Sequence, residues 1–125
     1  MEATAPTVLE NNFWEYLDRL VAASPLVIDR PGGSHHPHYP HIVYPLDYGY
    51  LEGTTTVDGG GLDVWAGTLP EKALTALVLT VDLHKRDVEV KLLLGCTEIE
   101  QQAILDFHND GLMCAVKVER YYKIP

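Results

Sequence analysis

The spacing of hydrophobic residues predicts two helices. Apolar side chains recur at helical spacing after Asn12, and this helix is expected to end before Pro25, because the residue before a proline avoids the α-helical region. Asn12 precedes a glutamate by three residues, as in a capping box. Thr97 and Glu100 have the same spacing and open a second predicted helix, which runs to about His108.

Short runs of β-branched and apolar residues predict the strands, at residues 26–29, 42–46, 48–51, 76–83, 88–94 and 115–119. Five to seven short strands with two helices are typical of a small, largely antiparallel barrel, so we expect a mainly β fold with flanking helices. The 125 residues suit a single domain spanning 1–125, of which residues 1–10 are expected to form a loose N-terminal arm.

The chain carries a large surplus of negative charge. It has 9 Lys and Arg against 18 Asp and Glu, which gives a formal net charge of −9. Nucleic acid and anionic membranes bind basic surfaces, so we expect neither as a partner, whereas bound divalent cations are compatible with this excess. No apolar stretch approaches the ~20 residues of a membrane span. With no visible secretory signal and only two cysteines, we expect a cytoplasmic protein.

A glycine-rich turn places two carboxylates close together in the sequence. Asp58 and Asp63 flank a segment that contains three successive glycines, whose conformational freedom permits a sharp fold. Mg²⁺ takes oxygen ligands, usually one or two carboxylates together with water and phosphate oxygens. The turn therefore predicts a cation site, although a hairpin with solvated acids accounts for the same residues.

A second pair of aspartates, Asp82 and Asp87, repeats the spacing of five across another predicted turn. Both pairs bracket strand ends, so they could meet at one mouth of a barrel, where like charges repel unless a cation or a proton intervenes. The alternative is a solvated turn whose own lysine and arginine balance the two carboxylates.

Three tyrosines, Tyr44, Tyr48 and Tyr50, lie close to Gly49 in the sequence. A phenol donates a hydrogen bond to a phosphate oxygen without adding charge, so these side chains are candidates for phosphate binding. Tyrosines in strands also serve as packing residues with a solvated hydroxyl group, and the sequence leaves both roles open.

The order of these motifs resembles that of the soluble family I inorganic pyrophosphatases. The segment Tyr44-Pro45-Leu46-Asp47-Tyr48-Gly49-Tyr50 is followed by Asp58-Gly59-x-x-x-Asp63-Val64 and then by the later aspartate pair. Val27-Ile28-Asp29-Arg30-Pro31 is similar to a family strand that has a glutamate at the place of Asp29. The resemblance covers about residues 26–118 and implies a small five-stranded, OB-like barrel of the inorganic pyrophosphatase type, with flanking helices.

This resemblance implies hydrolysis of inorganic pyrophosphate to two phosphates, with Mg²⁺ or Mn²⁺ activating the attacking water and neutralising the phosphoryl groups. It implies three catalytic aspartates that ligate metal directly: Asp58, Asp63 and Asp87. Asp82 would join a second metal position, and Asp29 would act through water. The residues that would contact the small-molecule phosphate substrate are Tyr48, Lys91, Arg30 and His108.

Several positions differ from the family pattern. Gly60 stands where the family has an aspartate that serves as general base or orients the nucleophile. Glu89 stands where the family has a lysine, and Lys91 follows two residues later on the same strand face. A loop replaces a hairpin that carries charged residues in the family, and it could bind phosphate, add metal ligands or be solvated. This loop contains four histidines: His35, His36, His38 and His41.

These differences leave two alternatives to pyrophosphate hydrolysis: a catalytically inactive homologue that binds metal or phosphate, and a hydrolase of another small phosphate compound. Nine basic residues are few for a protein that binds a multiply charged anion, so metal must neutralise most of the substrate charge or the activity is lost. The sequence leaves the oligomeric state open, and a homo-oligomer is among the expected forms.

Overall fold

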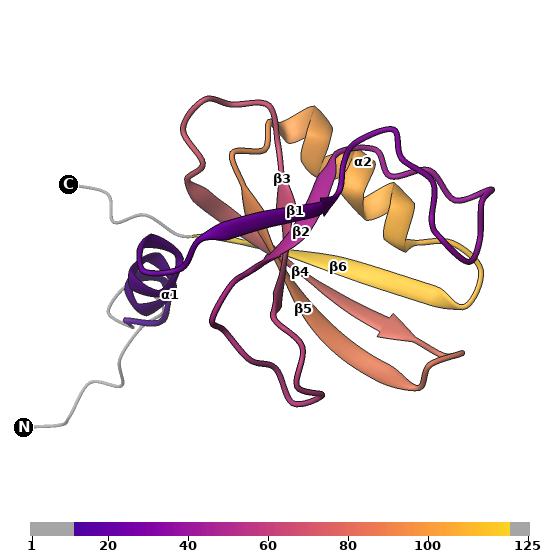
Figure 1. Cartoon of the computed structure of the whole chain (residues 1–125), viewed down its shortest axis with the longest axis horizontal. Coiled ribbons are helices and arrows are strands. Elements are labelled where there is room, and N and C mark those ends of the chain that lie inside the picture. Colours follow the sequence, from indigo (N-terminus) through magenta and orange to yellow (C-terminus); the bar gives the residue numbers. More distant parts are fainter. Residues whose placement is uncertain (1–11, 121–125) are drawn as a thin grey trace, which may run out of the picture.

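The chain folds around one six-stranded β-sheet. The computed structural model describes residues 12–120, so the expected N-terminal arm lies outside the described residues. Helix α1 (Phe13–Ala22) precedes the first strand, and helix α2 (Glu98–His108) precedes the last (Figure 1). The strands, in chain order, are β1 (Leu26–Arg30), β2 (Asp47–Leu51), β3 (Leu62–Ala66), β4 (Leu74–Asp82), β5 (Asp87–Leu94) and β6 (Met113–Glu119).

The strand order in the sheet is β1-β2-β3-β5-β4-β6, and all neighbours are antiparallel except β3 and β5. β4 and β5 form a hairpin that ends with Asp82 opposite Asp87, and the hairpin folds back so that β5 lies beside β3. The parallel pairing begins with Asp63 opposite Lys91 and spans only four residue pairs. Among the described residues, the first half of β5 therefore has no strand partner on the β3 side.

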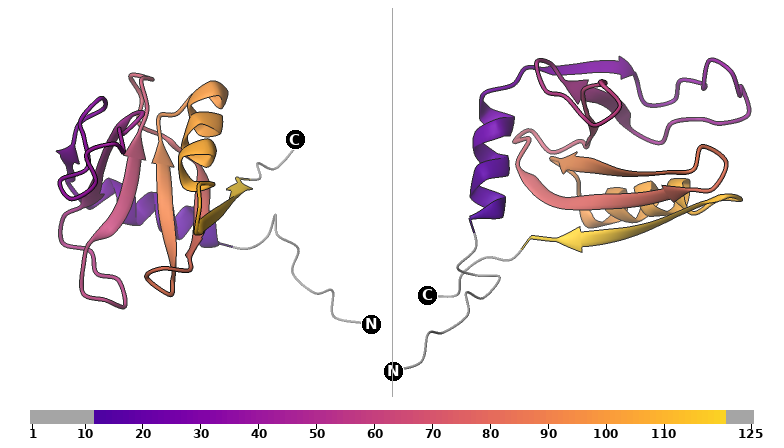
Figure 2. Two further views of the ribbon diagram at one scale, coloured as in Figure 1. Left: turned by 90° about the vertical axis from the view of Figure 1, so that its right-hand side faces the viewer. Right: turned by 90° about the horizontal axis from the view of Figure 1, so that it is seen from below.

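The two helices cover opposite faces of the sheet. Helix α2 packs through Ile104 against a core that contains Trp65 and Val78. Helix α1 stands across one end of the strands, where Trp14 packs in a second core with Leu77 (Figure 2). Val78 and Leu77 are successive residues of β4 and point to opposite faces, as the period of two in a strand requires. Burial of these apolar side chains provides the main stabilisation of the fold.

The two helix starts differ in how they are capped. The hydroxyl of Thr97 accepts the N–H of Glu100 at 3.2 Å, and the Glu100 carboxylate accepts the N–H of Thr97 at 2.9 Å, so the predicted capping box of α2 is confirmed. Helix α1 starts at Phe13 as predicted, but Asn12 makes no side-chain cap hydrogen bond, and the predicted capping box there is wrong. A capping side chain requires an extended backbone at its own residue, and the backbone of Asn12 is not extended.

The mainly β class with two flanking helices is confirmed, and the sheet differs in detail from the predicted barrel. It has six strands rather than five, and within residues 12–120 its edge strands β1 and β6 do not pair, so the sheet is not closed. Helix α1 explains this difference, because it covers apolar residues of β2 to β5 that closure would otherwise bury. The strand predicted at 42–46 is instead a loop with one isolated bridge, between His35 and Val43. Neither described helix is long and apolar enough to span a bilayer.

Gly49 in β2 allows the backbones of β1 and β2 to approach closely. A Cβ atom at this position would lie 1.8 Å from the carbonyl oxygen of Val27, and the next nearest atoms also belong to the β1 backbone. Backbone atoms in a paired strand cannot move aside as a flexible side chain can. Glycine is therefore required here, and the β1–β2 register around Tyr48 and Tyr50 depends on it.

We predict that Gly49→Ala lowers the free energy of unfolding by at least ~2 kcal/mol, because the added methyl group must push β1 away from β2. Gly60→Ala is the matched control, since the nearest atom to its Cβ would lie 3.7 Å away, and we expect a change within ~0.5 kcal/mol. Urea unfolding followed by circular dichroism measures both changes. Equal stability of the two variants would contradict the role given to Gly49.

Candidate functional site

The ammonium group of Lys91 lies at the centre of a buried charged cluster, and the residue is only 4% exposed. Its Nζ donates hydrogen bonds to the hydroxyl of Tyr48 at 2.8 Å, to Oδ2 of Asp63 at 2.9 Å and to Oε1 of Glu89 at 3.1 Å. Asp63 is the partner of Lys91 across β3 and β5, and Glu89 precedes Lys91 by two residues on the same strand face. Three acceptors thus satisfy the three protons of one buried ammonium.

The charges in this cluster follow from burial and from the neighbouring groups. Burial by itself lowers the pKa of Lys91, but Tyr48, Asp63 and Glu89 outweigh it, and the pKa of Lys91 is raised above its ordinary value. Burial also raises the pKa of Tyr48 above its ordinary value, so its hydroxyl keeps its proton. The cluster is therefore one ammonium beside a neutral phenol and two carboxylates, which leaves an excess of negative charge.

A pocket of ≈ 600 Å³ opens beside the Lys91 cluster, and Asp63 and Glu89 line it, whereas Lys91 and Tyr48 do not. It lies between the loop that precedes β3 and the first half of β5, which has no neighbouring strand on that side in the described chain. No three acidic, histidine or cysteine side chains of residues 12–120 converge closely enough to form a complete metal site by themselves. Four acidic residues line this carboxylate pocket: Asp58, Asp63, Asp87 and Glu89.

Asp58 is exposed at the carboxylate pocket and is oriented by its own loop. Its Oδ1 accepts hydrogen bonds from the hydroxyl of Thr56 and from the N–H of Gly60, the latter at 3.3 Å. These bonds, above all the one from Thr56, lower the pKa of Asp58 below its ordinary value. Asp58 therefore stays ionised at neutral pH, with its carboxylate held in a defined direction.

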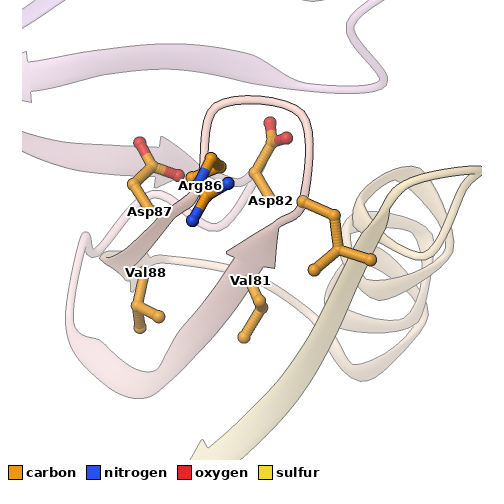
Figure 3. A pocket seen from close by; sticks show the side chains of 6 residues that line it. Val81, Asp82, Arg86, Asp87 and Val88 are labelled. Carbon is orange, nitrogen blue, oxygen red and sulfur yellow. The ribbon is translucent and has the colours of Figure 1, made fainter.

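Asp82 and Asp87 lie opposite each other at the end of the β4–β5 hairpin, and both carboxylates project to the same side (Figure 3). Asp82 stabilises the turn, because its Oδ1 accepts the N–H groups of Lys85 at 3.0 Å and His84 at 2.9 Å, and these bonds lower its pKa. Oδ1 of Asp87 is buried and has no hydrogen-bond partner among the described residues. Asp87 lines the carboxylate pocket, whereas Asp82 does not, and Oδ2 of Asp87 lies 3.9 Å from Nζ of Lys85.

Asp29 and Arg30 lie on β1 and do not line the carboxylate pocket. The pairing of β1 with β2 skips Asp29, which sits exposed at this irregularity. The guanidinium of Arg30 lies over the ring of Tyr44 and donates a hydrogen bond to its hydroxyl. The Tyr44 ring stacks on Tyr48 with 5.6 Å between centroids, so two aromatic rings lie between the Arg30 side chain and the Lys91 ammonium.

His108 lies in the core rather than at the carboxylate pocket. Its Nε2 accepts a hydrogen bond from the indole N–H of Trp65 at 3.0 Å. Burial, with a smaller contribution from the charge of Lys91, lowers the pKa of His108 to about 3, so the ring is neutral at physiological pH. The substrate contact predicted for His108 would require this buried ring to become accessible.

The histidine-rich loop is ordered by contacts with its own backbone and with aromatic rings. Nδ1 of His36 accepts the N–H groups of His38 at 3.0 Å and Tyr39 at 3.2 Å, and its ring stacks on Tyr44. Nδ1 of His35 lies 2.6 Å from the carbonyl oxygen of Pro40. None of the loop's four histidines lines the carboxylate pocket.

Two contributors to the site, Glu89 and Thr56, are not among the residues predicted from the sequence as part of the site. Glu89 has a sequence signal, since it precedes Lys91 by two residues in a strand and therefore shares its face. Thr56 precedes Asp58 by two residues in a loop, a spacing at which hydroxyl and carboxylate side chains often form local turns. Neither signal identifies which side chains of other strands lie nearby, because that depends on the order of the strands in the sheet.

No protein-family model matches this chain, and no curated protein matches its sequence. Solved structures that resemble it include an inorganic pyrophosphatase from Neisseria gonorrhoeae, 18% identical over 71% of this chain and 77% of that one, with a TM-score of 0.57. An inorganic pyrophosphatase from Coxiella burnetii is 15% identical over 75% of this chain and 82% of that one, with a TM-score of 0.53. An inorganic phosphatase from Anaplasma phagocytophilum is 15% identical over 75% of this chain and 81% of that one, with a TM-score of 0.50. At these identities the likeness concerns the fold alone, and this chain has a pyrophosphatase-like fold.

Proposed function

We propose that this protein is a divalent-metal-dependent hydrolase of a phosphoanhydride, with inorganic pyrophosphate as the simplest substrate. The observation that carries the proposal is the carboxylate pocket, lined by Asp58, Asp63 and Asp87 within a pyrophosphatase-like fold. Its volume of ≈ 600 Å³ lies in the range of small-molecule sites.

The residues of the carboxylate pocket fit a hard cation such as Mg²⁺ or Mn²⁺. Mg²⁺ commonly takes one or two carboxylates and completes its shell with water and phosphate oxygens, so three converging side chains are not needed. Asp87 has a buried acceptor without a partner among the described residues, and Asp58 is exposed and ionised, so these two would hold the cation. Bound metal would supply an activated water and neutralise phosphoryl charge. Asp82 and Asp29 lie outside this pocket and would act at a second position or through water.

Lys91 and Tyr48 would provide hydrogen-bond donors for a phosphate group. The ammonium offsets part of the negative charge of Asp63 and Glu89, which would otherwise repel an anionic substrate. Direct contact requires Lys91 to exchange one of its three acceptors for a phosphate oxygen. Tyr48 keeps its proton because burial raises its pKa, so its hydroxyl would act as a donor.

One observation favours a second candidate function, an inactive module that binds metal or phosphate. All three protons of Lys91 are already used within the protein, and Gly60 offers no side chain where a carboxylate is expected to orient water. In that case the carboxylate pocket would bind a cation without turning over a substrate.

We predict phosphate release from pyrophosphate in the presence of Mg²⁺ or Mn²⁺, and a loss of at least ~10-fold in Asp58→Asn, which removes a carboxylate from the pocket. A colorimetric phosphate assay measures both. Asp106→Asn is the matched control, because Asp106 is an exposed aspartate of α2 that does not line the pocket, and it should keep full activity.

No phosphate release with either metal would contradict the hydrolase. Titration calorimetry with Mn²⁺ and with phosphate then decides between the remaining possibilities. Binding without turnover supports the inactive module, whereas no metal binding at all rejects both functions. Release from another small phosphate compound, but not from pyrophosphate, would identify a hydrolase with a different substrate.

We predict that Lys91→Met raises the affinity for Mn²⁺ while it lowers the stability of the metal-free protein. Loss of the ammonium leaves Asp63 and Glu89 facing each other without a counter-charge, which should cost at least ~2 kcal/mol of unfolding free energy and which a divalent cation would relieve. Thermal unfolding with and without Mn²⁺ measures both effects.

Lys117→Met is the matched control for this variant. Lys117 lies on β6, pairs with Glu119 at 2.9 Å and does not line the carboxylate pocket. Its removal should leave the stabilisation by Mn²⁺ unchanged. An equal response of both variants to Mn²⁺ would show that the Lys91 ammonium does not compete with metal for these carboxylates.

A further inference from the structure

Strands β5, β4 and β6 present a continuous apolar face on the side opposite α2. Their register aligns side chains in rows across the three strands, and no charged residue occurs in these rows. We refer to this surface as the apolar face. Its rows are Val88–Val81–Cys114, Val90–Leu79–Val116 and Leu92–Leu77–Val118.

Helix α1 covers only one end of the apolar face. Trp14, Leu17 and Val21 pack with Leu77 and Leu92, which are fully buried. Toward the β4–β5 turn no described element lies over the face, and its five valines are between 37% and 70% exposed. A sheet face in contact with water normally carries polar side chains at alternate positions. The rows of this face lack that alternation, so the face has the pattern of one that is covered rather than in contact with water.

At the end of the β4–β5 hairpin the acidic side chains point away from this face (Figure 3), although Val88 and Val90 also line the carboxylate pocket. Val81 and Val88 project to one side of the hairpin, and Asp82 and Asp87 project to the other (Figure 3). A hollow of ≈ 440 Å³ at this end lies at the border between the two sides, because it is lined by three apolar and three charged residues: Val81, Leu83, Val88, Asp82, Arg86 and Asp87.

We propose that the apolar face is the contact between two copies of this chain, packed sheet on sheet around a twofold axis. Together with Leu83, its five exposed valines form one contiguous apolar patch, and a contiguous patch of this kind on a protein surface marks an interaction site. A partner of complementary charge would need charged residues in the rows, and they contain none. Homodimer contacts are more apolar than other interfaces, and a twofold axis brings the same face to both sides.

The test is the oligomeric state of the full chain by sedimentation velocity. We expect the wild type to sediment as a dimer and Val116→Lys as a monomer, because the substitution places a charge in the middle row. Ile99→Lys is the matched control: Ile99 is 84% exposed on α2, on the other side of the sheet, and this variant should remain dimeric. Circular dichroism verifies that both variants are folded. If Val116→Lys does not fold, Val118→Lys in the next row takes its place.

Cys114 provides a second readout that needs no substitution. It lies in the first row and is exposed in one chain, whereas Cys96 is buried, so a thiol reagent reports on Cys114 alone. Its reaction should be at least ~10-fold slower in the dimer than in monomeric Val116→Lys, because a packed interface excludes the reagent. A wild type that is monomeric at high concentration overturns the proposal. The proposal is also overturned if the dimer persists in both valine variants, or if Ile99→Lys dissociates it. Free reaction of Cys114 in the dimer would overturn it as well.

Discussion

The ammonium of Lys91 is the interaction on which the arrangement of the sheet's centre depends. It connects Tyr48 of β2, Asp63 of β3 and Glu89 of β5, at the point where the short parallel pairing of β3 and β5 begins. Buried ion pairs contribute little net stability, because the loss of hydration offsets most of their attraction, and apolar residues of similar volume are often as stable. The effect of these ion pairs on the charge next to the carboxylate pocket is therefore larger than their effect on net stability.

The distribution of charge along the β4–β5 hairpin follows from the period of two in a strand. Acidic side chains and Lys91 occupy the face toward α2 and the carboxylate pocket, whereas valines and leucines occupy the other face. The negative surplus of the chain is thus partly gathered at one place, where a single buried ammonium offsets it. The negative charge of these side chains would attract a cation from solution to the carboxylate pocket and would repel an anion.

The sequence was informative where structure is local and less so where it depends on strand order. The capping box at Thr97 and Glu100 and the β4–β5 hairpin could be predicted, because neighbouring residues determine them. The spacing of Asp58 and Asp63 indicated a shared site, and both line the carboxylate pocket. The same spacing of five between Asp82 and Asp87 does not indicate that both line the carboxylate pocket. The Asp82 carboxylate instead accepts backbone N–H groups of its own turn. The parallel contact between β3 and β5, and with it the role of Glu89, follows only from tertiary packing.

The short β3–β5 pairing has a consequence for the order of folding events. The bonds from Lys91 to Asp63 and Tyr48 span 28 and 43 residues of sequence, whereas the turn of the β4–β5 hairpin closes between Asp82 and Asp87. Closing a long chain segment costs more conformational entropy than closing a short one, so distant pairings form after local ones. The β4–β5 hairpin should therefore assemble first, and the β1–β2–β3 half should dock onto it later. The carboxylate pocket lies along that seam, so partial opening of the sheet would dismantle the pocket while the hairpin persists.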